Sequence, residues 1–286
     1  MNFYIYGFFN LNRTTISMKN INWNYPENIE DAVDFIKSDQ AVPHGGGVHL
    51  TGKKLTNAAN FICLDKLPLH YVSKEGNSIK IGSLTDYNSV ALQMNKILPG
   101  HILSKSLGKA ATEPLRNRIT IGGSLRLAPN WSDLIGPLVA LDAQVKIEGS
   151  TSGEFPVTDF LNNSELKRNT LITEISFPAT SWGSWYYREG VVENDHPAFT
   201  ITILTKQNKT LLEDIAIVIT GHTKRFMRVE AIESQLKGEN IDQVDLKGIV
   251  KGMNLKFPSV RGMSAEYLEH LAETQLERGL EKLLKS

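Results

Sequence analysis

Two glycine clusters are the part of this sequence whose residue types and spacing could do chemistry. The first is Gly45–Gly47, and the second is the glycine pair inside Ile119–Ser124, about 75 residues further along the chain. Glycine lets backbone N–H groups come close to a ligand, and successive N–H groups form concave sites for anions. Two such turns could hold one large anionic ligand from two sides. The pattern therefore favours a dinucleotide cofactor between two loops.

Other reactive groups give weaker signals. The single cysteine, Cys63, predicts no internal disulfide, no cysteine-based zinc site and no iron–sulfur cluster within this chain. His44 and His49 flank the first cluster, but no carboxylate or cysteine lies beside them at metal-ligand spacing, so loop packing or a phosphate contact is favoured. There is no Ser-His-Asp pattern and no paired-carboxylate pattern. The sequence predicts neither a metal site nor a catalytic side chain.

Composition limits the partners and the compartment. The 286 residues carry 31 Lys and Arg against 31 Asp and Glu, scattered along the chain, so nucleic acid and anionic membranes are poor candidates. The length favours two domains, and a lone thiol fits a reducing, cytoplasmic location. Residues 1–17 are rich in aromatic side chains but lack a basic start and a cleavage site. They are predicted to be an N-terminal extension that need not be ordered.

A mixed α/β pattern must position the two glycine clusters. Apolar spacing predicts a helix over 26–38 and a short strand entering the first cluster. A helix capped by Thr85 and a helix over 102–111 precede the second cluster. Further elements are predicted as strands over 60–64, 70–73, 78–82, 144–148 and 171–177, and as a helix over 133–141.

The segment after Pro178 changes character. Two β-branched runs, 198–205 and 215–220, are separated by Lys206–Lys209, which predicts an antiparallel hairpin. Helices follow, the last over 264–285. A sheet covered by helices is a normal small α+β domain.

At the level of whole motifs the chain resembles the FAD-binding (medium) subunit of the molybdenum hydroxylase family, of the xanthine dehydrogenase, carbon monoxide dehydrogenase and aldehyde oxidoreductase type. The resemblance rests on an ordered series: Gly45–Leu50, Arg116–Leu125, Ser132–Leu134, Leu171–Pro178 and Arg261–Tyr267. It implies an α+β fold of the vanillyl-alcohol-oxidase (PCMH) type, with two α/β subdomains over 18–180. A C-terminal domain over 181–286, with a three-stranded antiparallel sheet and helices, would follow.

The same resemblance implies a set of FAD-binding residues. The pyrophosphate loops would be formed by Gly45, Gly46, Gly47, Val48, His49 and Leu50, and by Thr120, Gly122, Gly123 and Ser124. Asp133 would accept a hydrogen bond from the cofactor, Leu171 and Ile172 would pack against it, and Arg188 would lie beside it. From the residues alone, Asp133 could equally be a helix N-cap, and Arg188 could be a solvent-facing strand residue.

The implied function is electron transfer. A large subunit with molybdopterin and a small 2Fe-2S subunit would be the partners, and NAD or a quinone is among the possible acceptors. Two alternatives stay open: a self-sufficient flavin oxidoreductase, and a binding or scaffold protein of this descent that has lost FAD. The second depends on His49 and Ser124, which depart from the residues usual in the family.

Overall fold

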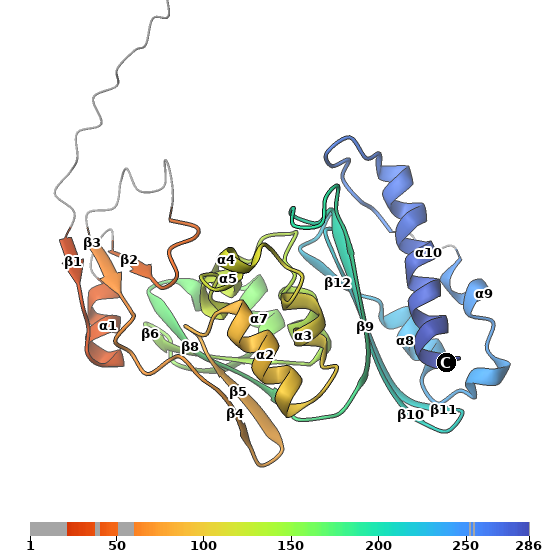
Figure 1. Cartoon of the computed structure of the whole chain (residues 1–286), viewed down its shortest axis with the longest axis horizontal. Helices are drawn as coiled ribbons and strands as arrows, with labels where there is room; N and C mark the ends of the chain where they lie inside the picture. Colours follow the sequence, from red (N-terminus) through yellow and green to blue (C-terminus); the bar gives the residue numbers. More distant parts are fainter. Residues whose placement is uncertain (1–21, 38–40, 51–59, 252, 254, 286) are drawn as a thin grey trace, which may run out of the picture.

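The computed structural model describes residues 22–37, 41–50, 60–251, 253 and 255–285, so the predicted extension 1–17 lies outside the described residues. The N-terminal unit is a small parallel sheet with the order β1-β3-β2, with bounds β1 (Asn22–Asn24), β3 (Asn60–Cys63) and β2 (Ala41–His44). Helix α1 (Ile29–Lys37) buries Ala32, Val33 and Ile36, which lie on one face at helical spacing. This unit forms one end of the molecule (Figure 1).

A five-stranded antiparallel sheet forms the middle of the molecule, in the order β4-β5-β8-β6-β7. The strands are β4 (Val72–Glu75), β5 (Ser78–Gly82), β8 (Thr170–Pro178), β6 (Gln144–Gly149) and β7 (Gly153–Pro156). Its helices are α2 (Tyr87–Ile97), α3 (Ile102–Leu107), α4 (Glu113–Arg116), α5 (Ile121–Leu127), α6 (Ile135–Ala140) and α7 (Val157–Asn162), with a 3-10 turn over Glu165–Lys167. The side chains of Ile79, Leu107, Ile121 and Val145 are fully buried in its core.

The C-terminal unit is a four-stranded antiparallel sheet in the order β12-β11-β10-β9. The strands are β9 (Gly183–Glu189), β10 (Phe199–Asn208), β11 (Leu211–Thr220) and β12 (Phe226–Arg228). The helical segments are α8 (Glu230–Leu236), a 3-10 turn over Ile241–Gln243, α9 (Leu246–Val250) and α10 (Ala265–Leu284), which lie at the far end of the molecule (Figure 1). The predicted three-stranded sheet is corrected to four, because Phe226–Arg228 pairs with the end of β11.

Helix α6 joins the middle and C-terminal units. It packs on β10 and β11, and Leu204, Ala216 and Val218 of that sheet belong to the same apolar core as the central helices. Gly136 allows this close packing, since a Cβ there would lie 2.9 Å from the Thr202 hydroxyl oxygen. The two units are therefore fixed to each other by a shared core.

Several predicted boundaries differ in the structure. Asp86, rather than Thr85, caps α2, while the Thr85 hydroxyl bonds both backbone polar groups of Tyr71 at 2.9 Å. The helix predicted over 102–111 ends at Leu107. The hairpin strands extend through most of Lys206–Lys209, because residue pairing continues to Asn208. The last helix is confirmed, with Ser264 as its N-cap.

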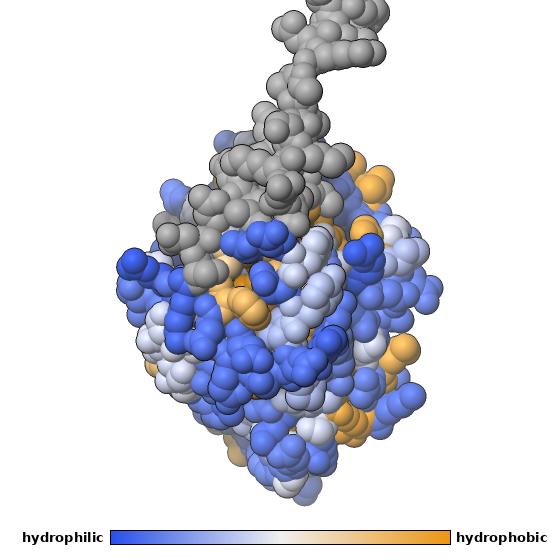
Figure 2. Space-filling model, turned by 90° about the vertical axis from the view of Figure 1, so that its left-hand side faces the viewer, coloured by the Kyte–Doolittle hydropathy of each residue, from blue (hydrophilic) through white to orange (hydrophobic). Residues whose placement is uncertain are grey.

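No helix among the described residues combines the length and the apolar character needed to cross a bilayer. Seen from the end that carries the N-terminal sheet, the described surface is mainly hydrophilic, with hydrophobic residues in small areas (Figure 2).

Candidate functional site

The first glycine loop packs directly on the segment that precedes the second. Arg118 donates from Nε and Nη2 to the Gly46 carbonyl oxygen at 3.1 and 2.9 Å. A Cβ on Gly46 would lie 1.5 Å from the Arg118 carbonyl oxygen, so glycine is required there by packing. Gly45 lies beside Thr120, whose Oγ1 would be 3.5 Å from an added Cβ. The structure thus brings the two predicted clusters together.

The second cluster is the first turn of α5, where the sequence pattern predicted a loop. Thr120 is the N-cap residue, and its hydroxyl oxygen accepts from the Gly123 N–H at 3.2 Å. The Gly122 N–H donates to the Ser83 carbonyl at 2.7 Å, and a Cβ on Gly122 would lie 2.8 Å from Ser83 Cβ. Gly123 is exposed, and a Cβ there would approach only Thr120 Oγ1, at 2.8 Å. Gly122 therefore serves packing, and Gly123 faces outward.

A cavity of about 250 Å³ opens between the first glycine cluster and Thr120, the N-cap residue of the helix that carries the second cluster. Its walls present glycine backbone, two imidazoles, two carboxylates, one guanidinium and one side-chain amide. The described residues that line it are His44, Gly45, Gly46, Asp65, His70, Leu84, Asp86, Asn117, Arg118 and Thr120. The Asp86 carboxylate is held by the Ser89 N–H and hydroxyl at 2.9 and 2.6 Å. The cavity can receive a polar, anionic group between two stretches of backbone.

The end of the first loop turns away from this cavity. Gly47 adopts φ +71°, the left-handed region, and the Leu50 N–H donates to its carbonyl at 3.1 Å. Val48 and Leu50 are half-buried and His49 is exposed, and none of the three lines the cavity. Their predicted contact with a cofactor stays a prediction.

Asp133 lies in a buried ion pair between the central and C-terminal units. Its Oδ1 accepts from Arg188 Nε at 3.0 Å and from the Tyr186 hydroxyl at 2.7 Å. The exposed fractions are 7% for the Arg188 side chain and 4% for that of Asp133. Burial raises the pKa of Asp133 to about 6, and Arg188 and Tyr186 act in the opposite direction.

The two alternatives open for this pair are both wrong. Asp133 does not cap α6, whose N-cap residue is Leu134; the Ser132 hydroxyl oxygen accepts from the N–H groups of Leu134 and Ile135 at 3.1 and 3.3 Å. Arg188 does not face solvent. It also donates to the Glu193 carbonyl at 2.9 Å and to the Asp195 carbonyl, which ties the loop after β9 to the ion pair.

The remaining predicted residues lie in or beside apolar cores. Leu171 and Ile172 are each 5% exposed but belong to different clusters: Leu171 packs with the N-terminal unit and Ile172 with the central core. Neighbouring residues of a strand point to opposite faces, so the two cannot form one face. Ser124 is half-buried on α5, where its side chain lies near the buried Tyr87 hydroxyl. Their predicted cofactor contacts stay predictions.

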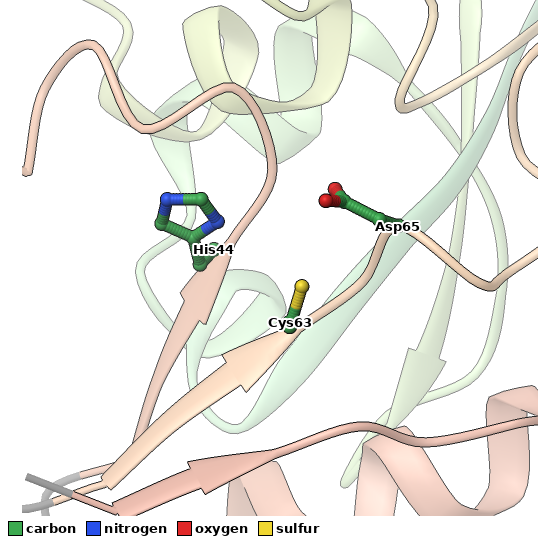
Figure 3. A group of neighbouring side chains, drawn as sticks. All are labelled: His44, Cys63 and Asp65. Carbon is green, nitrogen blue, oxygen red and sulfur yellow. The ribbon is translucent and has the colours of Figure 1, made fainter.

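Sequence reasoning missed one cluster of possible metal ligands. His44, Cys63 and Asp65 place one nitrogen, one sulfur and one oxygen atom within 4.8 Å of one another (Figure 3). The prediction of no cysteine-based zinc site therefore stays a prediction. Burial raises the pKa of the Cys63 thiol. The parallel pairing of β2 with β3 brings His44 beside Cys63, and the spacing of these residues in the sequence gives no sign of that pairing.

Comparison with known proteins gives a family match over more than half of the chain. Residues 19–180 match the family described as "FAD binding domain in molybdopterin dehydrogenase".

Two curated relatives and one solved structure extend the likeness to most of the chain. The 6-hydroxypseudooxynicotine dehydrogenase complex subunit alpha of Paenarthrobacter nicotinovorans is 29% identical over 255 residues, which cover 83% of each chain. The glyceraldehyde dehydrogenase medium chain of Sulfolobus acidocaldarius is 25% identical over 238 residues, covering 78% of this chain and 83% of the relative. A chain of carbon monoxide dehydrogenase from Hydrogenophaga pseudoflava superposes with a TM-score of 0.84 at 20% identity, covering 92% and 97%. The last likeness shows a shared fold.

Proposed function

This chain belongs to the FAD-binding subunits of molybdopterin dehydrogenases, and from this we propose that it is the electron-transfer subunit of a multi-subunit dehydrogenase of the molybdenum hydroxylase type. The predicted family, the α+β fold class, the oxidoreductase class and FAD as cofactor are confirmed by the comparisons. We further propose a molybdopterin-containing large subunit and a 2Fe-2S small subunit as partners. In such a complex the chain would lie between the iron–sulfur subunit and a final acceptor such as NAD or a quinone, in the cytoplasm.

The meeting of the first glycine cluster with Thr120 at one cavity carries the assignment of the cofactor site. The cavity has Gly45 and Gly46 on one side and Thr120 on the other. The exposed Gly123 follows Thr120 in the same turn. Neither glycine cluster could carry side chains without losing the close backbone packing between Gly46 and Arg118 or between Gly122 and Ser83. This geometry supports placing an anionic diphosphate between the two backbones.

The residues present fit the pyrophosphate part of FAD. Gly123 is exposed and carries no side chain, and Arg118 provides an exposed cation at the cavity. We propose that Gly45, Gly46, Thr120 and Gly123 hold the diphosphate, chiefly through backbone N–H groups and the Thr120 hydroxyl. FAD, when bound, accepts and releases electrons, while the protein supplies position and electrostatic environment.

We propose a second role for the Asp133–Arg188 pair. The pair joins the central unit to the loop after β9, so it would hold two walls of the cofactor site in a fixed relative position. Asp133 Oδ1 already accepts two hydrogen bonds, which leaves Oδ2 as the oxygen for a hydrogen bond from the cofactor. This role is tested by flavin retention in Asp133→Asn.

The experiment for the diphosphate site is flavin retention in a matched pair of glycine variants. Gly123→Val should abolish flavin retention while the chain stays folded, because the side chain would occupy the space above the backbone. Gly248 is the matched control, since it is an exposed glycine whose N–H also bonds the N-cap side chain three residues earlier, that of Asp245 at 3.1 Å.

Flavin should be quantified by absorption and by chromatography after denaturation, and folding by circular dichroism. Wild type and Gly248→Val should retain equal flavin. Full flavin content in folded Gly123→Val would refute the assigned site, and a wild-type protein that FAD cannot reconstitute would refute the function.

A further inference from the structure

His44, Cys63 and Asp65 meet at the ends of two neighbouring parallel strands. His44 closes β2, and its direct partner in the register is Cys63, the last residue of β3. The backbone holds this arrangement, because the Leu64 N–H donates to the His44 carbonyl at 3.0 Å. Asp65 follows two residues after Cys63, so the three side chains come from a short stretch of fixed backbone. Figure 3 shows the three side chains arranged around a common space.

The His44 ring has a buried nitrogen that lacks a partner. Nδ1 is buried and makes no hydrogen bond within the described part of the chain. Nε2 lies on the side of Gly47, since a Cβ there would be 2.6 Å from it. A ring nitrogen faces the side on which Cys63 and Asp65 lie (Figure 3). Because buried polar atoms are nearly always hydrogen-bonded or metal-bound, an unpartnered nitrogen beside a thiol and a carboxylate points to a missing cation.

The three donor atoms define the class of cation. One imidazole nitrogen, one thiolate sulfur and one carboxylate oxygen suit Zn²⁺ and similar borderline transition metals, and a cysteine ligand disfavours Mg²⁺ and Ca²⁺. Zinc bonds of about 2.0–2.3 Å place ligand atoms roughly 3.3–3.8 Å apart in a tetrahedron. The observed limit of 4.8 Å requires a shift of about 1 Å, which the exposed Asp65 side chain can supply by rotation.

We propose that His44, Cys63 and Asp65 form a binding site for Zn²⁺ or a similar divalent transition metal, with its fourth position open. His44 and Asp65 both line the cavity between the first glycine cluster and Thr120. The fourth position therefore faces that cavity, where water or an anionic ligand completes the tetrahedron. Three protein ligands with one open position distinguish such a site from closed structural zinc sites, which have four protein ligands.

The test is metal binding by the full-length chain, produced without a histidine tag. After removal of metal with a chelator, Zn²⁺ is titrated in competition with a chromophoric chelator, and bound metal is counted by mass spectrometry after gel filtration. We expect one Zn²⁺ per chain. Co²⁺ added to the same protein should give a thiolate-to-cobalt charge-transfer band in the difference spectrum, which reports Cys63 because the chain has no other cysteine.

Single variants separate the three ligands from unspecific binding. Cys63→Ser and His44→Gln should weaken Zn²⁺ binding by about 100-fold or more, since each removes one of the three protein ligands. Asp65→Asn, at an exposed position, should weaken it by about tenfold. His270→Gln, at an exposed position of α10, is the matched control and should bind as wild type does.

Folding and flavin content are measured on each variant, so that loss of metal is distinguished from unfolding. Folded wild type without stoichiometric Zn²⁺, absence of the thiolate–cobalt band, or unchanged affinity in folded Asp65→Asn and Cys63→Ser would each overturn the site. Zn²⁺ binding in a wild-type chain that FAD cannot reconstitute would support the metal site while refuting the proposed cofactor role, because the metal site does not depend on FAD.

Discussion

The glycine side and the ion-pair side of the proposed cofactor site are built on different physical principles. On the glycine side, backbone packs on backbone: Gly46 meets the Arg118 carbonyl, and Gly122 meets Ser83. On the other side, the buried Asp133–Arg188 pair joins two structural units through charge. The first arrangement is sensitive to volume and nearly insensitive to pH. The second depends on which charges are present. Four predictions test this contrast.

The largest effect is expected when the ion pair loses its cation. Arg188→Leu would leave the Asp133 carboxylate buried without its cation, and it would release the carbonyls of Glu193 and Asp195. At pH 8 we expect the free energy of unfolding to fall by about 3–5 kcal/mol. Chemical denaturation monitored by circular dichroism measures this change.

An exposed ion pair provides the control for this variant. Arg168 and Glu165 are 4.0 Å apart, with both side chains about three-quarters exposed. Arg168→Leu should cost at most about 1 kcal/mol. Equal losses for the two arginine variants would show that burial does not distinguish the two pairs.

The second prediction concerns the pH dependence of Asp133. Its folded-state pKa of about 6 lies above the unfolded value of 3.8, so the folded state binds more protons between these two values. The contribution of Asp133 to stability is therefore complete below about pH 4 and is lost as the pH rises through 6. Relative to Asp133→Asn, wild type should lose on the order of 2–3 kcal/mol between pH 4 and pH 7.

The measurement is the free energy of unfolding of both proteins over this pH range. It shows which of two opposing effects on the pKa of Asp133 is larger: burial, which raises it, or the Arg188 guanidinium, which lowers it. A difference that grows in favour of wild type as the pH rises would contradict the prediction, and would mean that Arg188 outweighs burial.

The third prediction, on the glycine side, is that a side chain at Gly46 lowers the stability of the protein by steric overlap. A Cβ at this position would overlap the Arg118 carbonyl, so Gly46→Ala must displace the loop from its partner segment. We expect a loss of about 1–3 kcal/mol in the free energy of unfolding, with no pH dependence between pH 6 and 8. Flavin content should fall with it. A Gly46→Ala protein with wild-type stability would contradict the packing role.

The smallest change in stability is expected at Gly123. Its added Cβ would meet only the Thr120 hydroxyl, and alanine is favoured over glycine inside a helix by about 0.5–1 kcal/mol, so the two effects offset each other. Gly123→Ala should therefore change the free energy of unfolding by less than about 1 kcal/mol. A larger loss, measured by the same denaturation, would show that Gly123 also serves packing.

Much of the fold could be predicted from local patterns. The apolar periodicity of α10 and the β-branched runs of β10 and β11 predicted these elements correctly. Helix and strand periods can be recognised within a short stretch of sequence, because they depend only on neighbouring residues. The cap of α2 was misplaced by one residue. Thr85 and Asp86 are both capable N-cap residues, and only the pairing of Thr85 with the Tyr71 backbone assigns the role to Asp86.

The candidate site was predicted less completely, for a physical reason. The glycine clusters were found because consecutive glycines have a specific backbone use. The roles of individual glycines were not, since Gly46, Gly122 and Gly123 differ only in what lies opposite each of them. The burial of Arg188 could not be predicted from the sequence either, because its partner Asp133 lies 55 residues away in the chain.

The sequence by itself determined the family, the fold class and the two glycine clusters, because ordered motifs and residue types persist without any contact being known. The tertiary structure alone decided which atoms meet. It assigned Asp133 to an ion pair rather than to a helix cap, and it brought the lone Cys63 beside His44 and Asp65. Parallel pairing of strands joins residues with no regular spacing in the chain, so such a cluster exists only once the sheet has formed.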